Sequence, residues 1–416
     1  MESHLGQTLP LWSVLPFVGL LLGIALLPLA RPHFWEKHFG KVSLAFGAPV
    51  GIYILLADYH EVVHTGLEYF SFIVLLAALF TISGGILLQG TLRGRPSVNC
   101  AFLAVGAVIA NILGTTGASM LLIRPLLRAN AQRKKKSHVI IFFIFIVANV
   151  GGVLTPIGDP PLFMGYLKGV PFFWTVKHLW HFWILAVSLI IGVFFFLDRH
   201  ALLSEERENP RVEEPVGERV PLSLAGTWNF LLLGAVIVAV FFPTPWREIV
   251  MLAATAISAR KTPKWIHEKN EFTYFPIEEV AILFAGIFAA MIPALLILKA
   301  RGAELGVSEP WHFFWATGSL SSFLDNTPTY LTFFSLAQGL PGPADIVGMS
   351  ARILQALSAG AVFMGANSYI GNAPNFMVKS IAEASGVQMP SFLGYMAYSV
   401  VVLVPIFVLV TWVFLE

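Results

Sequence analysis

Two aspartates lie in stretches of the sequence that otherwise carry no formal charge. Asp325 stands in FLDNTPTY (323–330), inside an apolar run that covers residues 311–340. Asp159 stands in TPIGDPP (155–161). Holding an ionised carboxylate away from water costs several kcal/mol unless it is paired or solvated. Each aspartate is therefore a candidate ligand for a proton or a metal cation, and one carboxylate that binds either ion in turn can couple their movements.

Each aspartate also has a simpler structural explanation, which the sequence leaves open. Asp159 precedes Pro160, and proline is favoured at the first position of a helix. The simpler alternative is therefore that Asp159 caps that helix and has no further role. Asp325 can be a hydrogen-bonded residue at the tip of a turn. No Lys or Arg falls beside either aspartate, although a site for citrate or another polyanion would more comfortably include one. We therefore predict a cation site, with exchange of Na⁺ or Li⁺ for H⁺ at Asp325.

The segments around these aspartates are rich in residues that interrupt helices. They read GTTGAS (114–119), ANVGGVLTPIGDPP (148–161), FLDNTPTY (323–330) and GANSYIGNAPN (365–375). Gly and Pro break the helical hydrogen-bond ladder and free backbone carbonyls and N–H groups. The carbonyls, with Thr, Ser and Asn oxygens, can replace the water shell of a small cation. Helix N-termini equally attract anions, so the breaks indicate an ion site without giving its sign.

The composition identifies the environment of these segments. Of 416 residues, 56% are hydrophobic and 12% are charged, about half the charged fraction of soluble domains. Apolar runs of membrane-spanning length recur along the chain, which predicts an all-α polytopic membrane protein in contact with lipid. Cys100 is the single cysteine, which excludes a disulfide within the chain. No basic arm with interleaved aromatic residues is present, so we expect no nucleic-acid partner.

Most of the apolar runs predict single membrane spans, but two predict hairpins. The stretches 97–127 and 310–340 are too long to cross a ~30 Å core once and have Gly/Thr/Pro-rich centres. We predict re-entrant helical hairpins there; the alternative is one long kinked helix in each case. Spans are predicted near 12–30, 42–57, 69–90, 138–165, 182–197, 223–243, 247–259, 276–298, 351–383 and 391–415.

The distribution of charge gives a predicted orientation. Most of the 26 Lys and Arg residues fall in loops that alternate with the spans, including RKKK at 133–136, and such loops are typically cytoplasmic. The loop 58–68 has neither Lys nor Arg and is placed outside. Basic residues flank the first hairpin on both sides, so we expect it to enter from the cytoplasm. The alternation of spans places the entry of the second hairpin outside.

Local matches between the two halves of the chain predict an internal repeat. Leu113 aligns with Leu324, Thr155 with Ser368 and Tyr69 with Tyr274, at nearly constant spacing. With opposite entry sides for the hairpins, this arrangement is typical of secondary transporters with two inverted-topology repeats, each with a re-entrant hairpin and a broken transmembrane helix. The predicted parts are an N-terminal repeat 1–197, a cytoplasmic linker 198–222 and a C-terminal repeat 223–416; the broken helices are 138–165 and 351–383.

Three other groups of residues have chemical potential. HEVVH at 60–64 matches the H-E-x-x-H pattern of zinc peptidases, with Glu68 four residues further, but it lies in a short predicted loop without further candidate ligands. A zinc-dependent membrane peptidase is therefore a minor alternative, and we expect no enzyme and no cofactor. Glu278 and Glu279 open a predicted span, where a helix N-terminus favours negative charge, although a part in transport stays open. Lys379 and Glu383, four residues apart, predict a local pair.

The chain resembles the Ion Transporter superfamily over essentially its whole length. The resemblance is carried by NILGTTGASMLLIRPLL (111–127), NVGGVLTPIGDPPLF (149–163), SSFLDNTPTYL (321–331) and GANSYIGNAPNF (365–376). It is nearest to the NhaD-type sodium/proton antiporter branch, which neighbours a citrate transporter family. The resemblance implies alternating access, a scaffold region and a transport region, a homodimer and a bacterial inner-membrane location.

The resemblance also assigns ion-binding positions. The polar residues of the hairpin tips fall at Thr115, Thr116, Ser119, Asp325, Asn326 and Thr327, and those of the broken helices at Asn149, Thr155, Asp159, Asn367, Ser368 and Asn372. It implies a Na⁺ site at Asp325, Asn326 and Thr116. The dicarboxylate branch has Ser-Asn-Thr at both tips, whereas this chain has Gly-Thr-Thr and Asp-Asn-Thr. That departure favours a cation substrate, with a proton- or sodium-coupled organic-anion transporter for citrate or a dicarboxylate as the alternative.

Overall fold

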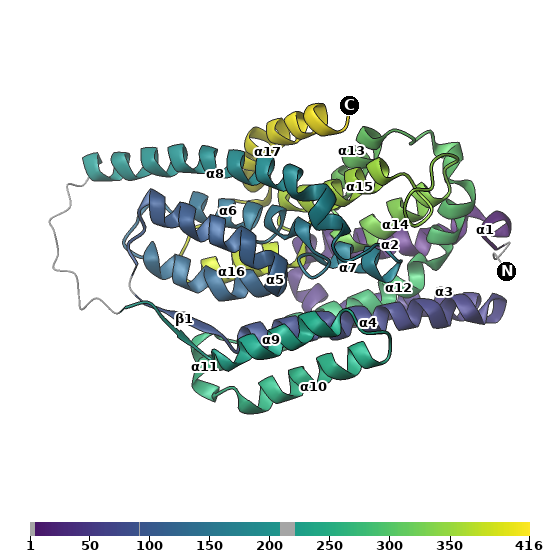
Figure 1. The fold of residues 1–416 in the computed structure, drawn as a ribbon, viewed down its shortest axis with the longest axis horizontal. Coiled ribbons are helices and arrows are strands. Elements are labelled where there is room, and N and C mark those ends of the chain that lie inside the picture. The colour runs from purple at the N-terminus through teal and green to yellow at the C-terminus, as the bar shows by residue number, and fades with distance from the viewer. Residues whose placement is uncertain (1–4, 91, 209–220) are drawn as a thin grey trace.

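A computed structural model describes residues 5–90, 92–208 and 221–416, and almost all of its regular structure is helical (Figure 1). A two-stranded antiparallel ladder joins β1 to β2. The elements are α1 (Leu5–Thr8), η1 (Leu11–Val14), α2 (Leu15–Ala30), α3 (Pro32–Ala57), α4 (Tyr59–Gly84), β1 (Leu87–Gln89), α5 (Pro96–Ala129), α6 (Ser137–Ile146), η2 (Val150–Leu154), α7 (Pro160–Leu167), α8 (Trp174–Glu208), β2 (Ser223–Ala225), α9 (Trp228–Ala239), α10 (Trp246–Lys261), α11 (Lys264–Lys269), α12 (Phe275–Arg301), η3 (Gly302–Leu305), α13 (Pro310–Ser321), α14 (Asn326–Gln338), α15 (Ala351–Met364), η4 (Gly365–Asn367), α16 (Ala373–Ala384) and α17 (Phe392–Phe414).

The helices confirm an all-α polytopic membrane protein. In the described part of the chain, eight helical segments are long and apolar enough to cross a bilayer. The span predicted at 223–243 forms a shorter helix than expected, whereas the span predicted at 247–259 is α10, which covers Trp246–Lys261. Helix α9 has 12 residues, which at 1.5 Å per residue gives about 18 Å, well below the thickness of a hydrocarbon core.

The helices form two layers, which meet along α4, α7, α12 and α14. An outer layer contains α2–α4 and α9–α12, and Figure 1 shows α3, α4, α9 and α10 running along one side of the molecule. A site layer contains α5–α8 and α13–α17, with α5, α6, α8, α16 and α17 on the other side. Helix α4 packs against α5 and α7, and α12 packs against α14. The broken helices therefore lie in one layer, against a second layer that supports them.

Contacts between its two ends show that the chain reverses within the first predicted hairpin, while its re-entry into a membrane stays a prediction. The side-chain amides of Asn99 and Asn130 exchange hydrogen bonds of 3.0 and 2.8 Å. A continuous helix would hold these residues about 45 Å apart, so the chain must reverse between them. The reversal is at Gly114, with φ 75° and ψ 157°, a backbone region that is essentially restricted to glycine.

The chain reverses within the second predicted hairpin in the same way. The rings of Phe313 on α13 and Phe333 on α14 lie 6.3 Å apart, whereas 20 residues of continuous helix would separate them by about 30 Å. The four residues between the helices contain Asp325, whose carboxylate accepts a hydrogen bond from the backbone N–H of Thr327 and so caps α14. One long kinked helix is excluded in both stretches.

Two segments predicted as loops or linker are in part helical. The predicted loop 58–68 belongs to α4, which begins at Tyr59 because Asp58 caps it through the backbone N–H of His60. Residues 198–208 of the predicted linker continue α8. Asp198 is fully buried there and pairs with Arg133 at 2.7 Å. The apolar periodicity of α8 ends before Asp198, and a buried ion pair within a charged segment leaves no signal in hydropathy. The rest of the predicted linker, 209–220, lies outside the described residues.

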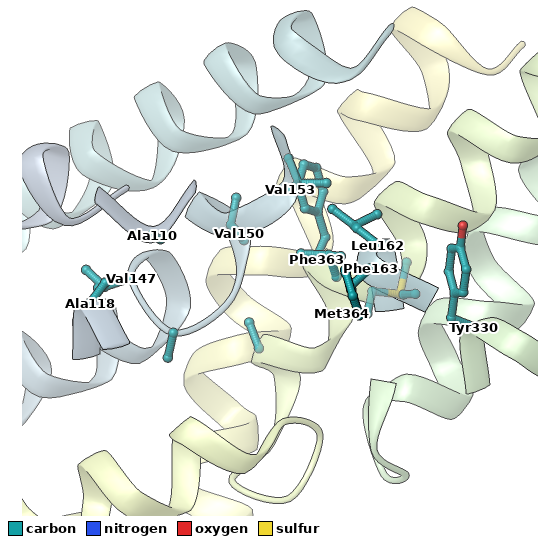
Figure 2. Packing of buried hydrophobic residues seen from close by; sticks show 14 of the residues in the cluster. Ala110, Ala118, Val147, Val150, Val153, Leu162, Phe163, Tyr330, Phe363 and Met364 are labelled. Atoms are coloured by element: carbon teal, nitrogen blue, oxygen red, sulfur yellow. The ribbon is translucent and has the colours of Figure 1, made fainter. Parts of the chain in front are cut away.

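Buried apolar side chains fill the space between the two broken helices. Figure 2 shows Leu162 and Phe163 of α7 gathered with Phe363 and Met364 of α15, with Tyr330 of α14 nearby. All five side chains are at most 2% exposed. This packing fixes the start of α7, and with it Asp159, against the second half of the chain.

Candidate functional site

Asp159 is the centre of a buried polar junction. Its side chain is fully buried, and three side chains donate hydrogen bonds to its carboxylate. The Thr115 hydroxyl donates to Oδ1 at 2.9 Å, the Asn326 amide to Oδ2 at 2.5 Å, and the Asn372 amide to Oδ1 at 3.2 Å. The donors come from both hairpin tips and from the other break, so the two halves of the chain build this junction together.

Each residue of this junction stands at the beginning of a helix. Thr115 begins the second arm of α5 after the break at Gly114, and Asn326 is the first residue of α14. Asp159 and Asn372 precede α7 and α16 in nearly identical extended conformations, and each of these helices has a proline in its first turn. The positive ends of four helix dipoles therefore meet at one carboxylate, an arrangement that favours negative charge.

A second set of amides holds the two breaks against each other. The Asn149 amide donates to Oδ1 of Asn375 at 2.7 Å, and the Asn375 amide donates to the carbonyls of Gly365 and Ser368. The Asn372 amide also lies 3.1 Å from the Ala148 carbonyl and 3.3 Å from Oδ1 of Asn149. Asn372 thus has acceptors besides Asp159, and these contacts connect the breaks directly.

The remaining predicted residues of the breaks bind the hairpin next to them. The Thr155 hydroxyl donates to the Asn111 carbonyl at 2.6 Å. At the matching place in the second half, the Ser368 hydroxyl donates to the Ser322 carbonyl at 2.5 Å, and the Asn367 amide donates to the Ser322 hydroxyl at 2.9 Å. Thr155 and Ser368 therefore hold hairpin against break and make no contact with Asp159.

Each break is closed by two glycines in close contact. A Cβ atom on Gly158 would lie 2.1 Å from the Gly152 carbonyl oxygen, and one on Gly371 would lie 2.5 Å from the Gly365 carbonyl oxygen. Both distances are too short for a Cβ atom, so only glycine fits at positions 158 and 371 in this backbone. The two breaks thus share a backbone arrangement, although the inverted orientation of the halves in a membrane stays a prediction.

The residues that we grouped as a Na⁺ site lie at the two hairpin tips in different environments, and their binding of Na⁺ stays a prediction. Asp325 is partly exposed, and its carboxylate caps α14, while the amide of neighbouring Asn326 points to Asp159. Thr327 is buried, and its hydroxyl lies 3.5 Å from Oδ1 of Asn326. Thr116 is partly buried and lies next to Thr115 at the tip. The polar junction of the described residues is therefore centred on Asp159.

Ser119 lies one helical turn beyond Thr115. Its side chain is fully buried, and its hydroxyl has no hydrogen-bond partner among residues 5–90, 92–208 and 221–416. Burying a hydroxyl without a hydrogen-bond partner lowers the folding stability of a protein. Because no partner in the described residues explains its burial, Ser119 stays a candidate ligand.

Three residues that hold the junction were absent from our predicted site. The side-chain oxygen of Asn111 accepts a hydrogen bond from the backbone N–H of Leu154, and its amide donates one to the Gly151 carbonyl. Ser322 receives the contacts of the second break, and Asn375 joins the breaks. Asn111 and Ser322 occupy equivalent positions in the local match between the halves, so the alignment itself could have identified them. Asn375 had no such signal, because the matching residue is Leu162.

The other groups with chemical potential lie apart from the junction. His60 and His64 are exposed on α4, and within the described ranges no three His, Cys, Asp or Glu side chains are placed to hold a metal ion. Glu278 lies in the first turn of α12, and Glu279 follows it. Lys379 and Glu383 form the predicted pair at 2.8 Å.

Basic side chains are remote from the junction in the part of the chain that the structure describes. None of the ion pairs there includes Asp159 or Asp325. The only positive potential at the junction comes from the helix N-termini and from amide and hydroxyl donors. A bound cation or proton would neutralise Asp159, and the same donors would then be free to face a second anionic group.

Comparison with known proteins agrees with a transporter. Residues 6–415 match a family described as "Putative citrate transport". A protein of Synechocystis sp. (strain ATCC 27184 / PCC 6803 / Kazusa), named as an uncharacterized transporter, is 22% identical over 440 residues, which cover 91% of this chain and 92% of the relative. Neither comparison names sodium or protons. Because the family match covers nearly the whole length, the chain belongs to this family of multi-pass membrane transport proteins.

Proposed function

We propose that the protein is a secondary-active transporter of a small organic anion of the citrate or dicarboxylate class, coupled to H⁺ or Na⁺. The observation that carries this proposal is the meeting of four helix N-termini at Asp159. Helix N-termini stabilise carboxylates, and the family match describes citrate transport.

The proposed coupling follows from charge balance at the junction. While Asp159 is ionised, its carboxylate occupies the donors of Thr115, Asn326 and Asn372. A proton or Na⁺ on Asp159 removes that negative charge and leaves the helix dipoles available to a substrate carboxylate. Cation and anion then stabilise each other in the site, so both move together when the protein changes between its two open states. We place the protein in a bacterial inner membrane, as a homodimer, on the resemblance alone.

Exchange of Na⁺ or Li⁺ for H⁺ is the second candidate. It is favoured by one observation, a buried carboxylate to which no Lys or Arg is paired in the described ranges. In this case Asp159 binds Na⁺ and H⁺ in turn, and no organic anion is required. Asp325, which we predicted as the exchanging carboxylate, caps α14 through Oδ1 and keeps further acceptor sites for a proton or a cation.

Proteoliposomes of the purified protein that contain an internal pH dye separate the two candidates. Citrate, a dicarboxylate, Na⁺, Li⁺ and K⁺ are added in turn. The proposed function predicts a proton movement or a Na⁺-dependent uptake of radiolabelled anion that requires the anion. A dye response to Na⁺ or Li⁺ in the absence of any organic anion would favour exchange. Protein-free liposomes are the control, and absence of anion uptake under every gradient would refute the proposal.

A further inference from the structure

The helix that begins at Asp159 is tied to the outer layer at its other end. Lys168 directly follows α7, and its ammonium lies 2.8 Å from Oε1 of Glu68 on α4. At the same end the Tyr166 hydroxyl donates to the Val240 carbonyl at 2.6 Å, and in the middle of α7 the Arg247 guanidinium lies 5.9 Å from the centre of the Phe163 ring. Helix α7 has eight residues, so about 12 Å separates this attachment from the junction.

Glu68 cannot release Lys168 without a replacement partner. The Glu68 side chain is only 9% exposed, against 23% for Lys168, so opening the pair leaves a carboxylate largely away from water. A second contact between the layers, Arg124 with Glu271 at 3.1 Å, differs in this respect because Glu271 is 74% exposed and water can solvate it at once. Of the two contacts, the pair of Glu68 and Lys168 is the one whose opening leaves a carboxylate largely away from water.

His64 supplies that replacement. Its Nδ1 lies 3.6 Å from the same Glu68 oxygen, and it stands one turn before Glu68 on α4. His64 is 64% exposed and moves with Glu68, whereas Lys168 moves with α7. When α7 leaves, His64 can approach Glu68 and donate a hydrogen bond to the carboxylate oxygen that Lys168 has left. The HEVVH segment, which contains no metal site in the described ranges, thus has a role in place of zinc binding.

We infer that Glu68 and Lys168 form a latch that holds the Asp159 helix against α4 in this conformation and opens in each transport cycle, with His64 taking over Glu68. This inference rests on the proposed function, because it requires that α7 moves relative to α4 to expose the junction to either side of the membrane. Polar contacts suit such a joint, since Glu68 has His64 as a second partner and Lys168 is already partly exposed to water.

A reversible crosslink tests the latch. The full-length protein carries Cys100→Ser to remove the single native cysteine, together with Glu68→Cys and Lys168→Cys. A short thiol-specific bifunctional reagent that dithiothreitol cleaves joins the two positions, and peptide mass analysis gives the crosslinked fraction. The matched control is Lys379→Cys with Glu383→Cys, a Lys–Glu pair at the same 2.8 Å distance within one helix. We expect citrate uptake to fall in proportion to the crosslinked fraction, to return after dithiothreitol, and to be unchanged in the control.

Unlinked proteins are assayed first, so that the two hypotheses fail separately. If the Cys100→Ser protein, which keeps Glu68 and Lys168, takes up no citrate, the proposed function is wrong, and the crosslink is scored on Na⁺-driven proton movement instead. Undiminished flux through crosslinked protein overturns the latch, and so does an equal loss in the control. A protein with neither flux overturns both. A second variant, His64→Asn, is expected to lower the maximal uptake rate with little change in KM, because it slows a conformational step rather than binding; a normal rate would contradict the role of His64.

Discussion

Replacing Asp159 by Asn isolates the charge of the junction from its shape. The side chain is fully buried and accepts hydrogen bonds from Thr115, Asn326 and Asn372. An Asn in its place keeps one oxygen acceptor, and a flip of the Asn326 amide would provide an acceptor for the new NH₂ group. Asn372 retains the Ala148 carbonyl. The expected cost in folding free energy is one imperfect hydrogen bond, about 1 kcal/mol.

The cost to ion coupling is expected to be much larger. A hydrogen bond or ion contact to a charged group is worth about 1.5–3 kcal/mol, so loss of the Asp159 charge weakens the apparent affinity for the coupling cation about 10- to 150-fold. The assay is uptake of radiolabelled citrate into proteoliposomes at a series of Na⁺ concentrations and pH gradients. Thermal unfolding in detergent is expected to show that the variant is folded. The variant is expected to lose the accumulation of citrate that a Na⁺ or pH gradient drives.

Asp325→Asn is the matched control for this substitution. Asn also caps helices, so α14 keeps its first hydrogen bond, and the three hydrogen-bond donors to Asp159 remain in place. We expect uptake close to that of the unmodified protein. Normal gradient-driven uptake by Asp159→Asn would refute the reasoning from the junction, and loss of coupling in Asp325→Asn alone would restore Asp325 as the exchanging carboxylate.

Three further substitutions test the backbone and the buried charges that support the site. Gly114→Ala places a side chain at φ 75°, ψ 157° and is expected to cost about 1–3 kcal/mol, seen as a lower Tm in detergent; an unchanged Tm would contradict the strained hairpin tip. Gly158→Ala brings a Cβ atom to 2.1 Å from a backbone oxygen, so we expect at least about 1–3 kcal/mol of destabilisation and loss of uptake, whereas full uptake would show that the break relaxes easily. Arg133→Met leaves the fully buried Asp198 with only His138 and Asn99 as partners and is expected to destabilise the protein by about 3 kcal/mol, the lower end for a broken buried pair. Arg133→Lys is expected to destabilise it less, and equal Tm values for Met and the original Arg would contradict a structural ion pair.

The sequence predicted the hairpins and breaks well because their signals are local. A Gly/Thr/Pro-rich interruption within an apolar run too long for one span has few structural solutions in a membrane. Both reversals fall where the composition placed them, at Gly114 and just before Asn326. Helix boundaries were less predictable where polar residues are buried by pairing, as at Asp198, because hydropathy treats every charge as exposed.

The centre of the site was the harder inference. Asp159 and Asp325 both lie in apolar runs, and sequence alone gives no reason to prefer the carboxylate that the structure buries. The difference arises from contacts between residues that are far apart along the chain, above all the bond from Asn326 to Asp159. A tip residue can turn its side chain inward or back to its own helix. The Asp325 side chain turns back to cap its own helix, whereas the Asn326 side chain points inward to Asp159, and no local sequence pattern reveals this difference.

The distance along the chain between Asn326 and Asp159 also has a consequence for biosynthesis. The two residues are 167 positions apart. At a rate of synthesis of about 5–20 residues per second, Asn326 therefore leaves the ribosome roughly 8–33 s after Asp159. During that interval Asp159 has only Thr115, from the same half, as a hydrogen-bond donor. The early half of the protein therefore waits in the bilayer with an incomplete polar centre, a feature that membrane chaperones and proteases can recognise until the second hairpin arrives.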